Sequence, residues 1–257
     1  MDLTIFSQLS LGLLASAVAI TLFAGVVKGA VGFALPLIMV SGLSSIIDPK
    51  LALAGMILPA LCANTLQSLR TGLRAALSTI REYWRYLLVL GIAIFLTAQL
   101  VVLMPDRVFF AVLGIPVVAL CLIQLAGFRL HVRPEHRFRA EWIIGAISGA
   151  MGGLAGTWGP TTVLYLMAID APKARQMIVQ GVIYGVGSVV LLVAHLESGI
   201  LNAQTIPLSL MFIVPAFTGM WIGFGLQDRM NQIVFRKVTL IVLAFAGLNL
   251  IRRAILG

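Results

Sequence analysis

Charged residues are scarce in this chain, and acidic residues are the scarcest. Of 257 residues, 11% are charged, with 9 Asp and Glu against 18 Lys and Arg, while 60% are hydrophobic. A soluble domain of this size could not keep so much apolar surface away from water. Apolar runs of about 20 residues, long enough to span a bilayer as helices, recur between clusters of charge. The composition therefore predicts an all-α protein, a polytopic transmembrane helical bundle.

Motifs that carry catalytic chemistry are also lacking. Cys62 and Cys121 lie inside apolar runs without metal-ligand spacing, so we expect small packing residues. Zinc-protease, serine-hydrolase and P-loop sequences do not occur. The three histidines are expected to be solvated, and no carboxylate lies in the middle of an apolar run. We therefore predict a protein that is not an enzyme, with no cofactor and no metal site.

The basic residues, which give a net charge of +9, lie in short loops such as 70–85 and 128–141. This pattern favours loops that face the cytoplasm rather than a nucleic-acid surface. If the N-terminus lies outside the cell, a topology with ten membrane crossings places most basic residues on the cytoplasmic side. A topology with eight crossings places fewer there. The apolar segments lie at about 9–27, 30–46, 51–69, 86–104, 108–126, 142–156, 158–169, 176–195, 206–226 and 233–251. Segments 30–46 and 158–169 are short, and each is either a tilted span or a re-entrant piece.

An internal repeat divides the chain. Residues 25–32 read GVVKGAVG and residues 145–152 read GAISGAMG, with glycines at the first, fifth and eighth places of both strings. Three further matches follow in the same order: Pro36 and Pro160, Pro49-Lys50 and Pro172-Lys173, and Asp106-Arg107 and Asp228-Arg229. Because each half holds about five segments, an odd number, the halves are predicted to be inverted repeats with broken or re-entrant helices, as in many secondary transporters.

The repeat predicts three regions. Residues 1–127 form the first transmembrane repeat, 128–141 a basic cytoplasmic linker, and 142–257 the second transmembrane repeat. Only the first glycine string carries a charge, Lys28. A lysine inside an apolar run costs about 2.5–3.5 kcal/mol on insertion scales. Lys28 therefore either snorkels to the interface or faces a polar cavity, opened by a break at Gly29 to Gly32, where it would attract an anion.

The second glycine string runs into further helix breakers, from Gly152 to Pro160. Unwound backbone in a membrane lines a cavity or is buried in protein. A helix that restarts near Pro160 would offer free N–H groups and a positive dipole end, which bind anions. The alternative is that the glycines only allow close helix packing.

The predicted substrate-binding residues lie at the two breaks and on the polar faces of the segments that follow them. Gln180, Tyr184 and Ser188 share one helix face by their spacing, and interhelical hydrogen bonding is the alternative role for such residues. The full set is Lys28, Gly29, Gly32, Pro36, Asn64, Gln67, Gly156, Thr157, Gly159, Pro160, Thr161, Gln180 and Tyr184.

The strings GVVKGAVGFALPL and GAISGAMGGLAGTWGPTTVLYL resemble the twin glycine-rich starts of the TauE/SafE sulfite exporter family, also called the toluene-sulfonate uptake permease family. The resemblance spans nearly the whole chain. It implies a multi-pass permease of the bacterial inner membrane for sulfite, sulfonates, thiosulfate or related anions. The first copy departs from the pattern, because Phe33-Ala34-Leu35 stands where the second copy has a longer glycine-rich loop.

We therefore expect a secondary permease that moves a small sulfur-containing anion by alternating access around two Gly/Pro-broken helices. The expected partners are the small anionic substrate and the lipid bilayer, and no nucleic acid. A coupling ion, H+ or Na+, and a homo-oligomer are left open. The alternatives are a transporter of small organic carboxylate anions and a non-transporting membrane scaffold.

Overall fold

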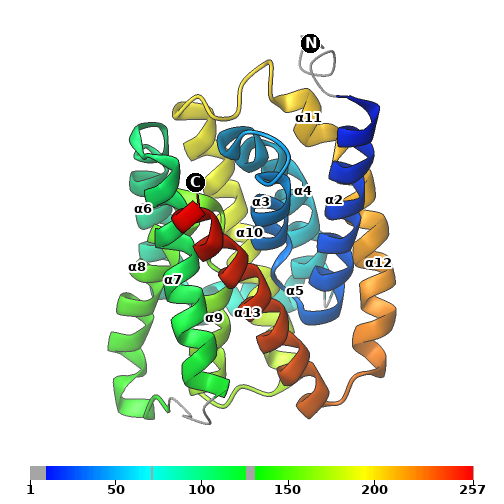
Figure 1. The fold of residues 1–257 in the computed structure, drawn as a ribbon. Helices are drawn as coiled ribbons and strands as arrows, with labels where there is room; N and C mark the ends of the chain where they lie inside the picture. Colours follow the sequence, from blue (N-terminus) through cyan, green and yellow to red (C-terminus); the bar gives the residue numbers. More distant parts are fainter. Residues whose placement is uncertain (1–9, 71, 126–130, 257) are drawn as a thin grey trace.

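The structure, a computed structural model, describes residues 10–70, 72–125 and 131–256 (Figure 1). In these ranges the chain is helical and has no strand. The α-helices are α2 (Leu11–Val31), α3 (Leu35–Leu43), α4 (Pro49–Leu69), α5 (Leu73–Glu82), α6 (Trp84–Ala98), α7 (Asp106–Leu125), α8 (Arg137–Ala155), α9 (Gly159–Ala168), α10 (Lys173–Glu197), α11 (Ile206–Met211), α12 (Ile213–Arg229) and α13 (Gln232–Leu256). Two short 3-10 turns complete them, η1 (Val101–Leu103) and η2 (Pro134–His136).

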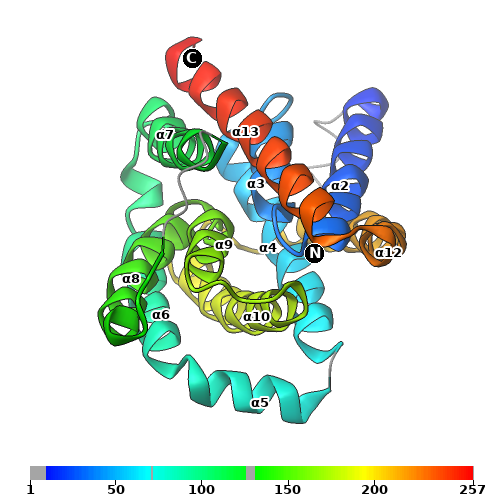
Figure 2. The ribbon, with the colours of Figure 1, turned by 90° about the horizontal axis from the view of Figure 1, so that it is seen from below.

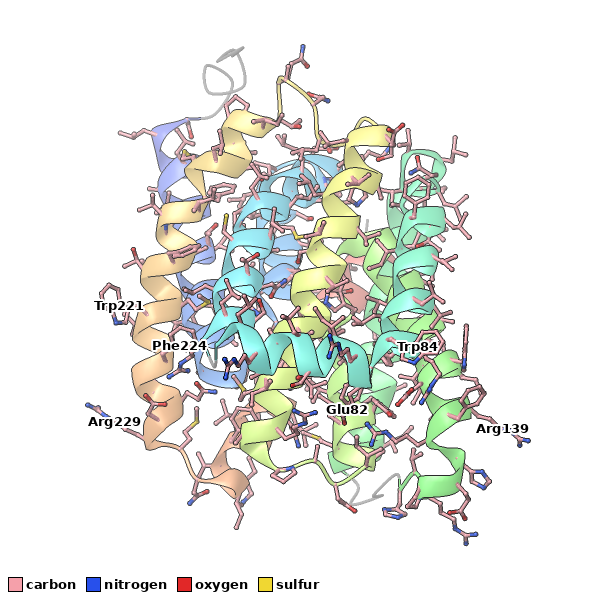
Figure 3. The ribbon with its side chains drawn as sticks, turned by 180° about the vertical axis from the view of Figure 1, so that it is seen from behind. Glu82, Trp84, Arg139, Trp221, Phe224 and Arg229 are labelled. Atoms are coloured by element: carbon pink, nitrogen blue, oxygen red, sulfur yellow. The ribbon has the colours of Figure 1, made fainter. Side chains whose placement is uncertain are left out.

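The outer surface of the bundle is apolar. Trp221 is 82% exposed, Phe245 72% and Val214 71%, and Trp221 points away from α12 in Figure 3. Among the described residues, 5 helical stretches are long and apolar enough to cross a membrane. A surface of this kind is stable in lipid and not in water. The prediction of an all-helical, multi-pass membrane protein is therefore confirmed.

Helices α2 and α3 form a hairpin. The chain leaves α2 at Gly32, which has a left-handed φ of 85°, and Ala34 (φ 78°) precedes α3. Helix α3 then returns alongside α2, so that Gly42 lies against the Ile20 side chain (Figure 1). The 9 residues of α3 extend roughly 14 Å at the usual helical rise, about half of a bilayer core.

Helices α8 and α9 form a second hairpin. Gly156, with a φ of 64°, ends α8, and α9 begins three residues later. The carbonyl of Ala168, the last residue of α9, accepts a hydrogen bond of 2.8 Å from the amide of Val132, which precedes α8. Helix α9 therefore returns to the level at which α8 starts. Its 10 residues are also too short for a bilayer core.

The first helix break begins only at the end of its predicted range, Gly29 to Gly32, whereas the second lies inside its predicted range, Gly152 to Pro160. Helix α2 continues through Gly29 to Val31, and α8 continues through Gly152 to Ala155. Of the two glycine strings, only Gly32 ends a helix, so the expectation of a break that begins at Gly29 is wrong. Most of these glycines serve helix packing instead, as the contacts of α2 and α8 make clear.

Helix α2 packs against α12 with their backbones in contact. A β-carbon on Gly25 would lie 3.1 Å from the Met220 nitrogen, and one on Gly29 would lie 2.8 Å from the Gly223 Cα. Only glycine allows this approach, since any side chain would hold the helices apart. Gly219 and Gly223 of α12 contact the α2 backbone in return.

Helix α8 packs against α6 in the same manner. A β-carbon on Gly145 would lie 3.0 Å from the Tyr86 carbonyl oxygen, and one on Gly149 would lie 2.5 Å from that of Leu90. The first and fifth glycines of both strings therefore have one role, close helix packing. Close helix packing, which the sequence analysis weighed only for the glycines of the second break, is thus the role of these four glycines.

Helices α4 and α10 cross at the centre of the bundle, and α7 packs along α13 at its edge (Figure 2). Asn64 of α4 donates a hydrogen bond of 2.6 Å to the Ser188 hydroxyl of α10. The N-cap of α4 is Asp48, whose carboxylate accepts from two backbone amides. The Asp48 cap fixes the start of α4, which follows the α2–α3 hairpin in the chain.

Two segments expected as loops contain helix. Residues 73–82 form α5, which lies roughly perpendicular to the long helices in front of α10 (Figure 3). Leu73 and Leu77 are exposed on one side of α5, and Ala76 and Thr79 face the protein. Within the predicted linker 128–141, α8 already begins at Arg137, and residues 128–130 lie outside the described ranges. Short amphipathic helices of this kind escape a search for long apolar runs.

Candidate functional site

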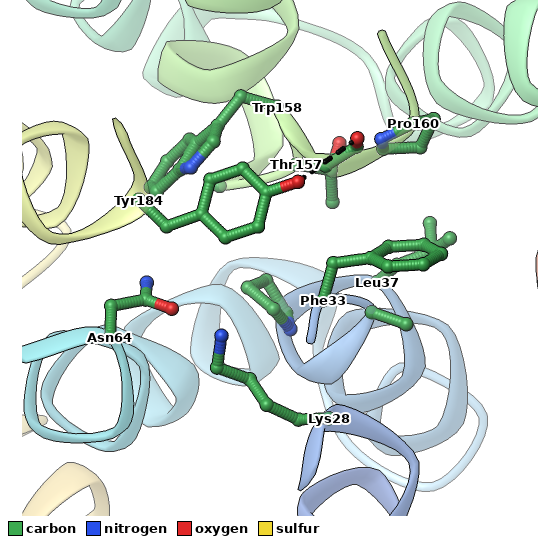
Figure 4. Close-up of a pocket in the computed structure, with 12 residues that line it drawn as sticks. Lys28, Phe33, Leu37, Asn64, Thr157, Trp158, Pro160 and Tyr184 are labelled. Atoms are coloured by element: carbon green, nitrogen blue, oxygen red, sulfur yellow. Dashed lines mark hydrogen bonds between the residues drawn. The ribbon is translucent and has the colours of Figure 1, made fainter. Parts of the chain in front are cut away.

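The tips of the two hairpins meet at a small cavity, in which about 20 Å³ is open to the centre of a water-sized sphere. About 10–15 Å³ measured in this way is enough for one water molecule, so the cavity has room for a water molecule or a small ion. Figure 4 shows side chains from α2, α3, α4, the α8–α9 tip and α10 converging on it. The lining residues are Lys28, Phe33, Ala34, Pro36, Leu37, Asn64, Gly156, Thr157, Trp158, Gly159, Pro160 and Tyr184.

Lys28 lies at the last turn of α2, with 1% of its surface exposed. Its ammonium donates to the Gln67 Oε1 atom at 2.6 Å and to the Gly32 carbonyl oxygen at 3.2 Å. The same nitrogen lies 5.3 Å from the centre of the Tyr184 ring. Lys28 therefore does not snorkel to the interface, and its head group faces the cavity (Figure 4).

The positive charge of Lys28 is surrounded by neutral groups. Within residues 10–70, 72–125 and 131–256, no carboxylate forms an ion pair with Lys28. An ammonium has three N–H donors, and two of those of Lys28 are used by neutral oxygens. A buried cation without a counter-charge is costly in the low dielectric of a membrane protein. An anion in the cavity would lower that cost.

Both half-helices point their N-termini at this cavity. Helix α3 has Pro36 and α9 has Pro160 in the first turn, and neither helix has a side-chain hydrogen bond at its N-cap, Ala34 or Trp158. The first N–H groups of a helix have no partner within the helix. Together with the helix dipole, they form a site of positive potential that favours anions. Two such ends and Lys28 face one cavity.

Hydroxyl groups behind α9 hold its first turn in place. The Tyr86 hydroxyl lies 2.7 Å from the Ser148 hydroxyl and 2.9 Å from that of Thr162. Thr161 lies 2.5 Å from Ser148 and donates to the Trp158 carbonyl. These contacts satisfy the hydroxyls among themselves. The predicted donor Thr161 therefore faces α8, and it does not line the cavity.

Several buried polar atoms near the cavity have no protein partner in the described chain. They are Asn64 Oδ1, Thr157 Oγ1 and both amide atoms of Gln180. Gln180 is fully buried, and a β-carbon on Gly32 would lie 2.5 Å from its Oε1 atom. Buried polar groups are normally hydrogen-bonded. Unpartnered atoms gathered around one cavity indicate a place where a polar ligand or water supplies the missing bonds.

The structure brings most of the predicted site residues together. Eight of them line the cavity: Lys28, Pro36, Asn64, Gly156, Thr157, Gly159, Pro160 and Tyr184. Gln67 joins the group through Lys28, and Gly32 and Gln180 lie next to each other beside it. Gly29 and Thr161 lie elsewhere, on the α12 contact and on the α8 contact.

Sequence reasoning missed the apolar walls of the cavity. Phe33, Leu37 and Trp158 line it, and Trp158 packs at 6.3 Å from the Tyr184 ring, whose hydroxyl donates to the Gly159 carbonyl (Figure 4). Phe33 and Trp158 lie in the helix breaks and Leu37 lies in the first turn of α3, and these positions were the available signal. Apolar walls exclude water and thereby strengthen the attraction of an anion to Lys28.

The expectation of solvated histidines is wrong for His195. His131 and His136 are exposed, but His195 is fully buried near the end of α10, with its Nδ1 atom 3.2 Å from the Ser198 hydroxyl. A position at the end of an apolar run suggested exposure. The final turn of α10 instead lies against Gln99, which follows α6 and donates to the Ala194 carbonyl, and His195 itself faces the Gly153 backbone of α8.

The bundle and its cavity define a class, the multi-pass helical membrane proteins with a polar site between hairpin tips. Within this class the chain belongs to the sulfite exporter TauE/SafE family, because the family model described as "Sulfite exporter TauE/SafE" matches residues 17–250. This is a family of membrane transporters, and the resemblance seen in the glycine-rich strings is confirmed. Comparisons with curated proteins and with solved structures found no match.

Proposed function

We propose that the protein is a secondary permease of the bacterial inner membrane for a small sulfur-containing oxyanion such as sulfite, a sulfonate or thiosulfate. The anion binds in the central cavity between Lys28 and the N-termini of α3 and α9. Alternating access then exposes this cavity to each side of the membrane in turn. The family membership supports the substrate class.

One observation carries the proposal: the buried charge of Lys28 pairs with no carboxylate of the described residues. A resident carboxylate would neutralise the lysine permanently and leave no attraction for a substrate anion. Neutral partners such as Gln67 hold the ammonium in place while its charge stays uncompensated. Binding of an anion therefore exchanges a costly unpaired charge for a pair.

The packing of the helices supports inverted repeats. The first helix of each half packs on a late helix of the other half, α2 on α12 and α8 on α6, while α4 packs on α10 and α7 on α13. From this pairing we infer two intertwined halves related by a two-fold axis. Rocking of one half against the other would move the two hairpin tips relative to each other, as in other transporters with inverted repeats.

The experiment that tests the proposal is sulfite flux into proteoliposomes, paired with the melting temperature of the purified protein with and without sulfite. Lys28→Met should abolish flux and remove the rise in melting temperature that sulfite causes. Without sulfite this variant should melt no lower than the wild type, because an uncompensated buried charge has been removed. The matched control is Lys237→Met, since Lys237 is exposed on α13.

Each alternative predicts its own outcome. Unchanged flux in Lys28→Met would show that the lysine does not bind the anion. Transport of acetate but not of sulfite by the wild type would favour the carboxylate alternative. A wild-type protein that neither transports nor binds either anion would fit a scaffold.

A further inference from the structure

A second pocket opens on the arginine-rich face of the bundle, next to the ends of α4 and α12. It is lined by Gln67, Arg70, Ala174, Met177, Ile178, Gln227 and Asp228. Gln67 belongs to this pocket and also accepts the hydrogen bond from Lys28, which lines the central cavity. A single amide side chain therefore connects the surface pocket to the buried cation.

Arg70 lies one residue after α4 and about one helical turn beyond Gln67. Its guanidinium lies 4.2 Å from the centre of the Phe224 ring and donates to Gln227 Oε1 at 2.8 Å. It also approaches the Asp228 carboxylate at 3.5 Å. The side chains of Arg70 and Asp228 are 40% and 69% exposed, and such an exposed pair is weak. A guanidinium has five N–H donors, so an arriving anion can replace Asp228.

The opposite approach to the cavity is apolar. At the tip of the α8–α9 hairpin, Gly156 lies against the Met56 and Leu191 side chains, and a β-carbon on Gly156 would lie 3.4 Å from Leu191. Met56 and Leu191 are fully buried. The polar route toward Lys28 therefore comes from the arginine-rich face, which is cytoplasmic by the positive-inside rule.

We propose that Arg70 is an outer binding site for the substrate oxyanion on the cytoplasmic side, and that Gln67 and Met177 form the gate between this site and the central cavity. This inference rests on the proposed function. The anion first displaces Asp228 from Arg70. It then competes with the Gln67 carbonyl for the ammonium of Lys28.

The gate has a physical basis in that competition. Gln67 is held by two hydrogen bonds, one accepted from Lys28 and one donated at 3.3 Å to the Met177 carbonyl. An anion is a stronger acceptor for an ammonium than a neutral amide. When the anion takes the Lys28 donors, Gln67 loses its stronger bond, and its side chain is then free to rotate away from the route.

The test measures sulfite transport in inside-out and right-side-out membrane vesicles that contain the full-length protein. Arg70→Gln should raise the KM for sulfite about two- to fivefold, the range of a half-exposed charge interaction, with an unchanged maximal rate. The rise should occur only in inside-out vesicles, which present the cytoplasmic face. Arg74→Gln is the matched control, because Arg74 is an exposed arginine outside the pocket, and it should leave the KM unchanged.

Two further variants keep the test decisive if Arg70→Gln folds poorly. Arg70→Lys keeps a point charge, so its KM should lie between those of Arg70→Gln and the wild type. Asp228→Asn should lower the KM because the competing carboxylate is gone. The inference is overturned if Arg70→Gln and Asp228→Asn leave the KM unchanged while Lys28→Met abolishes transport. In that outcome the central site stands alone. A wild type without sulfite flux in either vesicle orientation would overturn both the inference and the proposed function.

Discussion

The contact between α2 and α12 offers a sharp test of the role of Gly29. The substitution Gly29→Ala adds one methyl group to α2. By helix propensity alone, alanine would stabilise the helix relative to glycine. The added carbon would lie 2.8 Å from the Gly223 Cα and would collide with the Met220 carbonyl oxygen. Both neighbours are backbone atoms, so no side chain can rotate away. The helices have to separate.

The size of this effect follows from the distances. Carbon atoms in contact normally lie about 3.5–4.0 Å apart, so α2 and α12 have to move apart by roughly 1 Å near Gly29. A gap of that size loses a quarter to a half of the dispersion energy between facing atoms. We therefore expect Gly29→Ala to lower the free energy of unfolding by about 1–3 kcal/mol, as overpacking does elsewhere.

The assay is thermal unfolding of the purified protein in one detergent. At about 2–4 °C per kcal/mol for a chain of this size, the melting temperature of Gly29→Ala should fall by roughly 2–12 °C. Gly225→Ala on α12 is the matched control, because nothing lies within 4 Å of a β-carbon at that position, and its melting temperature should stay the same or rise. If Gly29→Ala melts with the wild type but loses sulfite binding, Gly29 acts in the site and the packing argument is refuted.

Two other substitutions test the buried ion pairs of Glu141 and the hydrogen bonds of the Tyr86 hydroxyl. The Glu141 side chain is only 1% exposed and accepts from two arginines, so Glu141→Gln should lower the melting temperature more than the exposed control Glu135→Gln. Equal melting of the two variants would show that the ion pairs add no stability. Tyr86→Phe removes the hydroxyl shared by Ser148 and Thr162 and should cost about 1 kcal/mol. If Tyr86→Phe has the melting temperature of the wild type, the Ser148 and Thr162 hydroxyls find hydrogen-bond partners without Tyr86.

Local backbone chemistry explains why parts of the site were predictable. Proline lacks an N–H group and fits the first turn of a helix, so Pro160 marked a helix start in the sequence. The lone charge at Lys28 marked a polar environment, because lysine is costly in an apolar run. These signals depend on single residues and their neighbours. They needed no knowledge of the fold.

Other parts of the site depend on neighbours that are distant in the chain. Gly29 and Gly32 look alike in the sequence, but Gly29 packs on α12 and Gly32 ends α2 with a positive φ. Thr161 was predicted to donate to the substrate, but its hydroxyl is hydrogen-bonded to that of Ser148 on α8. His195 is buried because the Gly153 backbone of α8 and Gln99 after α6 lie against the end of α10. Such roles are set by packing, which spacing along the chain does not encode.

The sequence by itself determined that this protein is a helical membrane protein of the TauE/SafE family, because hydrophobic run length and glycine-rich strings are local properties. Only the tertiary structure decided that the two hairpin tips share one cavity, and that Lys28 reaches it without a counter-charge from the described part of the chain. It also placed Arg70 and Gln67 in one pocket. The physical reason is that burial and electrostatic pairing depend on which helices lie side by side.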